Sequence, residues 1–200
     1  MKQKKTGRPR EFDKEEALSA AMHVFWKQGY DGASMRDLTG AMNISGPSLY
    51  ATFGDKEQLF KEAIDYYVNQ NACKPLVVFE TEPDIETAVR KFLFEIIQYS
   101  TDSVSGAKGC FLSSSVSTTA GELDGIEEML KRAIYDTDDR LARRFELEKA
   151  RGVLRKDFPS QARARLMFDL RQGVVFRARA GIEPQKIAED IENNIKVILG

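Results

Sequence analysis

The sequence contains few of the residues that build metal sites or disulfide frameworks. Its 200 residues include two cysteines, Cys73 and Cys110, and one histidine, His23. Two cysteines cannot form a framework of several disulfides, and one histidine adds too few ligands to complete a tetrahedral zinc site. We therefore expect no bound metal and no cofactor.

Long hydrophobic runs are also missing. The longest unbroken apolar run, residues 76–79, has four residues, whereas a membrane-spanning helix needs about 18 or more. The basic amino-terminal stretch lacks the apolar segment and the small-residue cleavage site of a secretory signal. Hydrophobic residues make up 42% and charged residues 30% of the chain, as in ordinary soluble proteins. We expect a cytoplasmic protein without a membrane partner.

No pattern typical of an enzyme stands out. His23 is the single histidine, so neither a Ser-His-Asp spacing nor a set of metal ligands can be built around it, and no glycine-rich loop could hold a phosphate group. The sequence predicts a protein that is not an enzyme. We interpret His23 as a residue at the boundary of the core.

Positive charge is concentrated at the start of the chain. The net charge is −1 overall, yet residues 1–10 carry five basic residues and no acidic residue. A basic arm on a near-neutral protein is typical of an interaction tail for a polyanion. The alternative is a solvated, frayed terminus without a function of its own.

Helical periodicity dominates from residue 13 onward, which predicts an all-α fold. Asp13, Ser34 and Ser45 are expected helix caps, Gly29 is expected to end the first helix, and the turn at residues 43–44 separates the second helix from the third. Four helices follow within residues 13–72, the middle two being short (34–42 and 46–52) and the fourth spanning 55–72. Two short helices between longer ones are typical of a helix-turn-helix module.

A larger helical bundle is expected in residues 73–200. Pro75 and Pro83 indicate a junction, and the predicted helices are 84–101, 109–120, 124–149, 159–180 and 184–198. Residues 113–119 contain six hydroxyl side chains in seven positions, which indicates a flexible loop or, because apolar residues flank it, a buried polar helix. The predicted organisation is a basic arm (1–12), a helix-turn-helix domain (13–72) and a carboxy-terminal domain (73–200).

Several motifs resemble those of a known family. Gly7-Arg8-Pro9-Arg10, Ser34-Met35-Arg36-Asp37-Leu38 and the stretch from Leu49 to Phe60 are similar to the DNA-binding domain of the TetR family of bacterial transcriptional regulators, over about residues 7–65. Gly109-Cys110-Phe111-Leu112 and residues 173–181 resemble segments of one TetR-like subgroup. The resemblance implies a homodimer that binds double-stranded DNA through its amino-terminal domain, and a carboxy-terminal bundle that binds a small-molecule effector.

The chain departs from the family pattern inside the third helix. Ala51 and Thr52 stand where the family commonly has a basic residue followed by histidine, so one usual phosphate contact is weakened or replaced by a hydroxyl. The helix also begins with Gly46-Pro47, which leaves few long side chains to reach bases. Proline is tolerated there because the first helical turn needs no intrahelical N–H donor.

The residues around this helix are assigned roles in DNA binding. Small side chains would let the backbone lie close to the bases, Tyr50 would pack on sugar with its hydroxyl on a phosphate, and Ser34 and Lys56 would hold phosphates at helix amino termini. The alternative for Tyr50 is that it covers the edge of the core. The candidate DNA-binding residues are Lys4, Lys5, Arg8, Arg10, Ser34, Arg36, Ser45, Gly46, Pro47, Ser48, Tyr50, Ala51, Thr52 and Lys56.

The carboxy-terminal bundle is expected to enclose a cavity and to dimerise. Apolar walls with few polar groups are typical of small-molecule pockets. The candidate effector-binding residues are Phe92, Ile96, Tyr99, Cys110, Phe111, Ser114, Ser115, Thr118, Phe145, Phe168 and Gln172. A seam of apolar and small residues is either an internal core stripe or, as the resemblance favours, a four-helix dimer interface. It comprises Leu166, Leu170, Gly173, Val174, Ala180, Ile187, Ile191, Ile195 and Ile198.

Cys110 allows two interpretations. It lies at an expected helix amino terminus two residues after Lys108, where a thiolate is stabilised, so it could sense oxidants or electrophiles. The alternative, and the commoner role of a free cysteine, is that of a small hydrophobic residue in the core.

The sequence therefore predicts a ligand-responsive transcriptional regulator, a repressor that binds a near-palindromic operator as a dimer and is released by a small molecule. The alternative is a small-molecule or redox-sensing module that acts as an activator or does not bind DNA.

Overall fold

The computed structural model describes residues 12–70, 74–101 and 109–200, and these ranges are helical throughout apart from turns and one isolated bridge between Ala120 and Leu123. The all-α prediction is confirmed. The helices are α1 (Lys14–Gly32), α2 (Met35–Met42), α3 (Gly46–Phe53), α4 (Lys56–Gln70), α5 (Lys74–Thr81), α6 (Ile85–Thr101), the π-helix η1 (Leu112–Val116), α7 (Ser117–Thr119), α8 (Ile126–Ala150), α9 (Ser160–Arg179), α10 (Pro184–Ala188) and α11 (Ile191–Leu199).

The amino-terminal helices begin where their capping residues predict, and α2 ends at the predicted turn, whereas α1 runs past Gly29 to Gly32. The Asp13 carboxylate accepts from the backbone N–H of Glu15 at 2.8 Å, and Ser34 forms a reciprocal capping box with Asp37. Gly29 has a φ of 76° and interrupts the helical backbone, although α1 resumes for one further turn. Asn43, in the left-handed conformation at φ 52°, closes α2. These local choices bring α2 and α3 into a helix-turn-helix arrangement.

Helix α5 replaces the junction expected between Pro75 and Pro83. Pro75 is the second residue of this helix, where its missing N–H has no intrahelical acceptor to serve. Pro75, Leu76 and Phe79 are buried, because α5 packs against α6 and α8. The sequence prediction of a break was wrong because Pro75 lies in the first turn of the helix and Pro83 follows its end, so neither interrupts it.

The hydroxyl-rich segment is helical and starts with a π-turn. Ser115 and Thr119 are buried, whereas Ser117 and Thr118 are exposed. Each hydroxyl of this segment has a local or tertiary backbone acceptor or a polar side-chain partner; for example, Ser114 donates to the carbonyl of Cys110 at 2.7 Å. Such bonds to the preceding turn explain how a buried helix carries so many serines and threonines.

The helix predicted over 184–198 is two helices. A turn at residues 189–190 separates α10 from α11. Ile187, Ile191, Ile195 and Ile198 are all buried within the subunit, where α10 and α11 pack on α6 and α9. For these four isoleucines the internal core stripe is therefore correct and the dimer seam is not.

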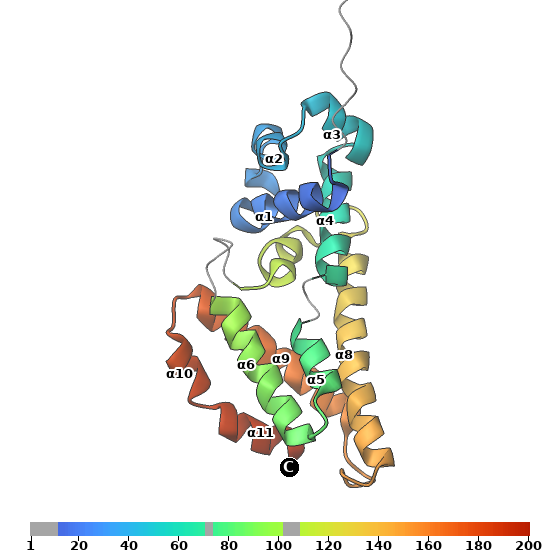
Figure 1. Cartoon of the computed structure of the whole chain (residues 1–200), viewed down its shortest axis with the longest axis vertical. Helices are drawn as coiled ribbons and strands as arrows, with labels where there is room; N and C mark the ends of the chain where they lie inside the picture. Colours follow the sequence, from blue (N-terminus) through green and yellow to red (C-terminus); the bar gives the residue numbers. More distant parts are fainter. Residues whose placement is uncertain (1–11, 71–73, 102–108) are drawn as a thin grey trace, which may run out of the picture.

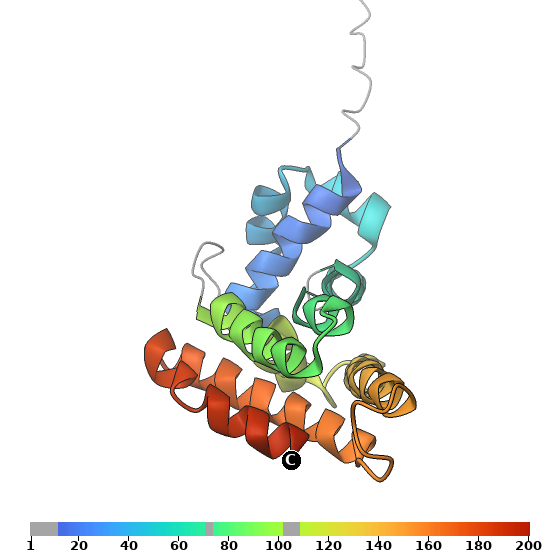
Figure 2. The same cartoon turned by 60° about the horizontal axis from the view of Figure 1, so that its bottom comes forward.

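The core is continuous from the helix-turn-helix end to the opposite end of the molecule. Figure 1 shows α1–α4 above the bundle of α5–α11, and Figure 2 shows α9, α10 and α11 together at the lower face with α6 above them in the view. An aromatic cluster of Trp26, Tyr67, Tyr99 and Phe111 spans the predicted boundary at residues 72–73, with ring centroids of Trp26 and Tyr67 5.5 Å apart. The two halves thus share buried side chains.

The described residues can be searched for membrane-spanning helices and for groups of metal ligands. None of the described helices has the length and apolar content needed to span a membrane. The same residues contain no group of three or more histidine, cysteine, aspartate or glutamate side chains positioned to hold a metal ion.

Candidate nucleic-acid interface and internal cavity

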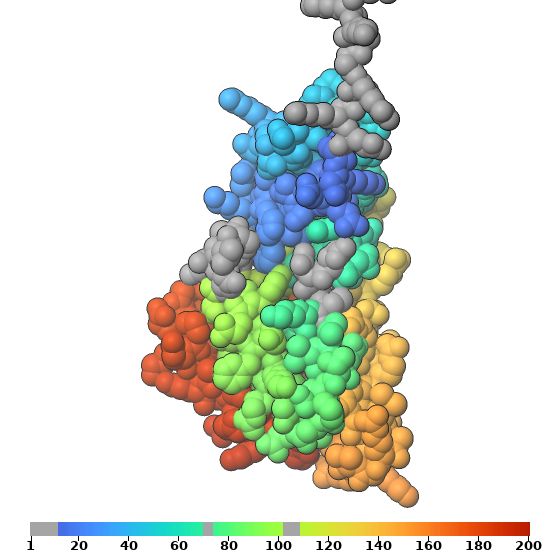
Figure 3. Space-filling model, viewed as in Figure 1, coloured from blue at the N-terminus to red at the C-terminus, as the bar shows by residue number. Residues whose placement is uncertain are grey.

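Helix α3 lies on the surface at one end of the molecule, remote from the carboxyl terminus (Figures 1 and 3). Leu49 and Phe53, four residues apart, are buried and hold the helix on the core, as the spacing predicts. Tyr50 is 57% exposed, and Pro47, Ala51 and Thr52 are exposed beside it. A side chain so exposed does not cover the core edge, so Tyr50 is available to a partner.

The serines at the starts of α2 and α3 make capping contacts. The Ser34 hydroxyl donates to the Asp37 carboxylate at 2.6 Å, and these hydrogen bonds lower the pKa of Asp37. The Ser45 and Ser48 hydroxyls lie 2.8 Å apart, and Ser45 accepts from the backbone N–H of Ser48. Ser34, Arg36 and Ser45 are exposed, whereas Gly46 and Ser48 are half-buried.

Lys56 occupies the first position of α4, and its ammonium group lies 4.4 Å from the centroid of the Tyr30 ring. A cation over an aromatic face is attracted by the ring's electron density. The side chain is therefore held near a helix amino terminus, where backbone N–H groups also favour an anion. Lys4, Lys5, Arg8 and Arg10 lie outside the described residues, so their predicted role stays a prediction.

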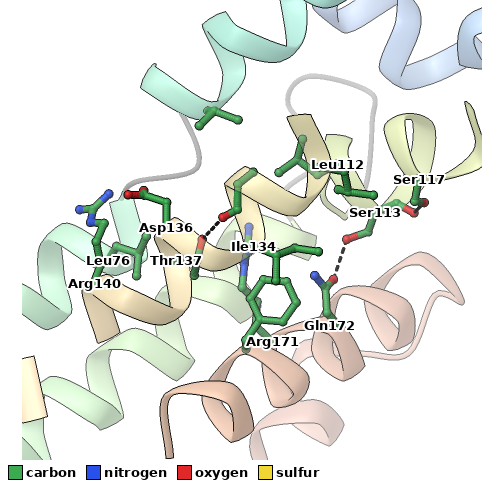
Figure 4. A pocket seen from close by; sticks show the side chains of 14 residues that line it. Leu76, Leu112, Ser113, Ser117, Ile134, Asp136, Thr137, Arg140, Arg171 and Gln172 are labelled. Carbon is green, nitrogen blue, oxygen red and sulfur yellow. Dashed lines mark hydrogen bonds between the residues drawn. The ribbon is translucent and has the colours of Figure 1, made fainter. Parts of the chain in front are cut away.

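A cavity of about 220 Å³ lies in the bundle between α8, α9 and η1, and Val68 of α4 and Leu76 of α5 also line it (Figure 4). Its walls are mostly apolar, with a few polar groups among them. It is lined by Val68, Leu76, Leu112, Ser113, Ser117, Leu130, Ala133, Ile134, Asp136, Thr137, Arg140, Phe168, Arg171 and Gln172.

Of the predicted effector-binding residues, Phe168 and Gln172 line this cavity. Phe92, Ile96 and Phe145 are instead core residues. The rings of Phe92 and Phe145 both pack edge-on with the Phe79 ring, with centroids 5.8 and 5.4 Å from it. The sequence pattern identifies them as buried but cannot say whether a buried side chain faces a void or a neighbour.

The hydroxyl segment faces the cavity with a different set of side chains from the one predicted. Ser113 and Ser117 line it, and the Ser113 hydroxyl donates to Gln172 Oε1 at 2.6 Å (Figure 4). Ser114 and Thr118 bond to backbone carbonyls of their own segment. Ser115 donates to the carbonyl of Phe25 at 3.1 Å, so it ties η1 to α1.

Sequence reasoning also missed the contribution of α8 and of Arg171. The α8 residues at 130, 133, 134, 137 and 140 recur at helical spacing and form one wall. That mixed apolar and polar stripe was a readable signal, since a helix face that is neither core nor fully solvated is typical of a pocket wall. Nothing in the sequence around Arg171 indicates that this charged side chain is buried.

Tyr99, Cys110 and Phe111 lie in a buried polar and aromatic cluster next to the cavity. Cys110 Sγ accepts a hydrogen bond from the Tyr67 hydroxyl at 3.3 Å and lies 3.6 Å from Arg171 Nη2, while Tyr99 donates to Tyr67 at 2.8 Å. Burial raises the pKa of the Cys110 thiol, but the Arg171 guanidinium and the Tyr67 hydrogen bond outweigh burial and lower it. The pKa of Tyr99 is raised, chiefly by burial.

Comparison with known proteins decides the family. The profile for bacterial regulatory proteins of the tetR family matches residues 17–63. The HTH-type transcriptional repressor ComR of Escherichia coli (strain K12) is 30% identical over 188 residues, covering 93% of this chain and 89% of ComR. The chain belongs to the TetR family of transcriptional regulators.

Further relatives of this TetR-family regulator agree with that assignment. A cysteine mutant of the TetR family regulator CifR, complexed with 26-bp double-strand operator DNA, superposes with a TM-score of 0.85 at 30% identity, covering 94% of this chain and 98% of CifR. The uncharacterized HTH-type regulator YezE of Bacillus subtilis (strain 168) is 25% identical, covering 96% of this chain and 99% of YezE. The likeness extends over both halves of the molecule.

Proposed function

We propose that this protein is a ligand-responsive repressor of transcription that binds a near-palindromic operator as a homodimer and is released by a small molecule in the cavity. It acts on DNA in the cytoplasm and carries out no catalysis. In this proposal residues 1–12 add salt-dependent contacts, residues 13–72 bind DNA, and residues 73–200 bind effector and dimerise. The CifR complex with operator DNA and the repressor names of ComR and BdcR support it.

The observation that carries the proposal is the path of α4. The helix begins at Lys56, beside the end of α3, and its Val68 lines the cavity. One continuous helix therefore contacts both the DNA-facing surface and the proposed effector. A ligand that displaces Val68 also changes the position of α3, because a helix transmits displacement along its length.

The outward face of α9 supplies the dimer contact. Leu166, Leu170 and Val174 are half-buried there, Gly173 is exposed, and Phe176 is 77% exposed. Exposed large apolar side chains in such a row are typical of protein interfaces. The α9 residues of the predicted seam therefore lie on this face, whereas the isoleucines of α10 and α11 pack behind it inside the subunit.

In-vitro selection of bound DNA from a random library tests DNA reading by the purified full-length protein. We expect enrichment of a near-palindrome with two similar half-sites. Ala51→Glu places a carboxylate on the exposed face of α3 without touching the core, so it should abolish enrichment while circular dichroism stays unchanged. Enrichment of no sequence by the wild type, or equal enrichment by the variant, contradicts the proposal.

A further inference from the structure

A guanidinium group is buried in the wall of the cavity. Arg171 projects from α9, is 8% exposed and lies in the cavity lining next to Gln172. Among residues 12–70, 74–101 and 109–200 no aspartate or glutamate forms an ion pair with it. Its contacts there are Cys110 Sγ at 3.6 Å and the Phe168 ring at 5.9 Å from the centroid. Burying a cation without a carboxylate is costly, which makes the site favourable to an anion.

The second arginine of the lining is differently placed. Arg140 donates from Nε and Nη2 to the two carboxylate oxygens of Glu80, both at 2.7 Å. This fork-to-fork pairing neutralises Arg140 within the protein. Of the two arginines, Arg171 therefore supplies the charge that a ligand can pair with.

The remaining lining defines the rest of the ligand. Leu76, Leu112, Ile134 and Phe168 offer apolar contact, and Ser113 with Gln172 forms a polar pair adjacent to Arg171. The volume of about 220 Å³ lies below the range of about 300–1,000 Å³ that is usual for drug-sized ligands. Asp136, the carboxylate among the lining residues, is exposed and lies beside Arg140, apart from Arg171 (Figure 4). The cavity therefore fits a compact molecule whose anionic end lies at Arg171.

We propose that the effector is a small organic anion, a carboxylate on a compact apolar body, whose carboxylate pairs with Arg171 while the body fills the apolar cavity. This inference rests on the proposed function, because it names the class of molecule that the regulator senses. A planar guanidinium matches a carboxylate with two parallel hydrogen bonds, which a neutral amide of the same shape cannot replace.

Isothermal titration of the full-length protein tests the class with matched pairs: benzoate against benzamide, 4-methylbenzoate against its amide, and hexanoate against hexanamide. At least one carboxylate should bind about tenfold or more tightly than its amide, since a charge-assisted hydrogen bond contributes about 1.5–3 kcal/mol. If every carboxylate binds no better than its amide, the inference is overturned.

Two variants assign the preference to Arg171. Arg171→Gln should abolish the preference for the carboxylate, whereas Arg171→Lys, which keeps a cation without the fork, should retain a smaller preference. Arg143→Gln makes the same change at an exposed site on α8, outside the cavity lining, and should leave the preference intact. If Arg171→Gln does not fold, the Lys variant decides alone: a preference equal to that of the wild type contradicts the inference.

Operator binding in the same samples separates this inference from the proposed function. Carboxylate binding that depends on Arg171 but leaves operator affinity unchanged supports the ligand class and contradicts effector control. Release of the operator by the neutral amides, with no effect of the carboxylates, contradicts the ligand class and keeps effector control.

Discussion

At the scale of single residues, the contacts at the DNA-facing end lead to a separation of roles. Lys56 is held near a helix amino terminus by Tyr30, and Tyr50 is exposed on α3. Lys56→Ala should weaken binding to all DNA sequences alike and lower the log–log salt slope by about 1 for each phosphate that the variant no longer neutralises.

Tyr50→Phe keeps the ring and removes only the hydroxyl, so it tests the proposed contact between that hydroxyl and a phosphate. Fluorescence anisotropy over a range of salt concentrations measures both; wild-type affinity and slope in both variants would show that α3 and α4 are not seated on DNA as proposed.

Cys110 keeps two interpretations that one substitution separates. Its burial matches the core interpretation, while the adjacent Arg171 and Tyr67 make the thiol more acidic than usual, which favours sensing. If sensing is correct, Cys110→Ser retains operator binding under reducing conditions and loses any response to peroxide, hypochlorite or quinones. Electrophoretic mobility shifts with and without each reagent decide it. Indifference of the wild type to all three reagents would leave the core role alone.

The same thiol makes carboxylate binding depend on pH. Cys110 faces Tyr67 of α4, Tyr99 of α6 and Arg171 of α9, and both tyrosines have raised pKa values, so they stay neutral where the thiol titrates. As pH rises through the lowered pKa of Cys110, the thiolate pairs with Arg171 and competes with the ligand. Benzoate affinity should therefore fall with rising pH, and Cys110→Ser should flatten the profile. Calorimetry across the neutral and mildly alkaline range that finds the opposite slope contradicts this coupling.

Residue types and spacing could predict much of the DNA-facing end, because capping and turn formation are local. Ser34, Asp37 and Asn43 form the predicted caps and turn. The cavity was harder to predict since its lining depends on helix phase. Ser113 and Ser117 line the cavity, whereas the sequence prediction named Ser114, Ser115 and Thr118, because the side of a helix that faces a void is decided by its packing in the fold.

At the scale of helices, α4 is not alone in joining the DNA-facing half to the bundle. Besides α4, helix η1 packs on α1 through Ser115, which donates to the carbonyl of Phe25. The sequence gives no sign of this second link, because long-range packing between η1 and α1 leaves no periodic signal. The wrong sequence predictions at α5 and at the α10–α11 turn have a related origin. In both places the local sequence is ambiguous, and tertiary packing decides whether the stretch forms a helix or a turn.

This second link predicts an effect on coupling. Ser115→Ala removes the hydrogen bond from η1 to α1, so effector binding should change operator affinity by a smaller factor, with a loss of stability of about 0.5–1.5 kcal/mol. Thr118→Ala, on an exposed neighbouring position, is the control.

By linkage the effector must bind the free and the operator-bound protein with affinities that differ by the same factor by which it changes operator affinity, typically about 5–150-fold. Equal affinities in calorimetry would contradict coupling in the wild type, and an unchanged factor in Ser115→Ala would contradict the second link.

At the scale of the whole molecule, a twofold assembly sets the spacing of the operator. A dimer paired through the outward face of α9 can read both half-sites of an operator when its two α3 helices lie on one face. A symmetric dimer of helix-turn-helix domains reads half-sites about one helical turn, roughly 34–36 Å, apart. Sedimentation should show a dimer at micromolar concentration, and Phe176→Glu should shift it towards monomer. A monomeric wild type, both free and on DNA, would contradict this assembly.

The aromatic cluster that joins the two halves has a consequence for genetics. Trp26, Tyr67, Tyr99 and Phe111 belong to one core, so the subunit should melt in a single cooperative transition rather than domain by domain. A bundle mutation that lowers stability then empties the operator without any change at the DNA-facing surface. In a screen for constitutive expression of the controlled genes, many alleles should therefore map far from α3, and cooler growth should restore silencing to them.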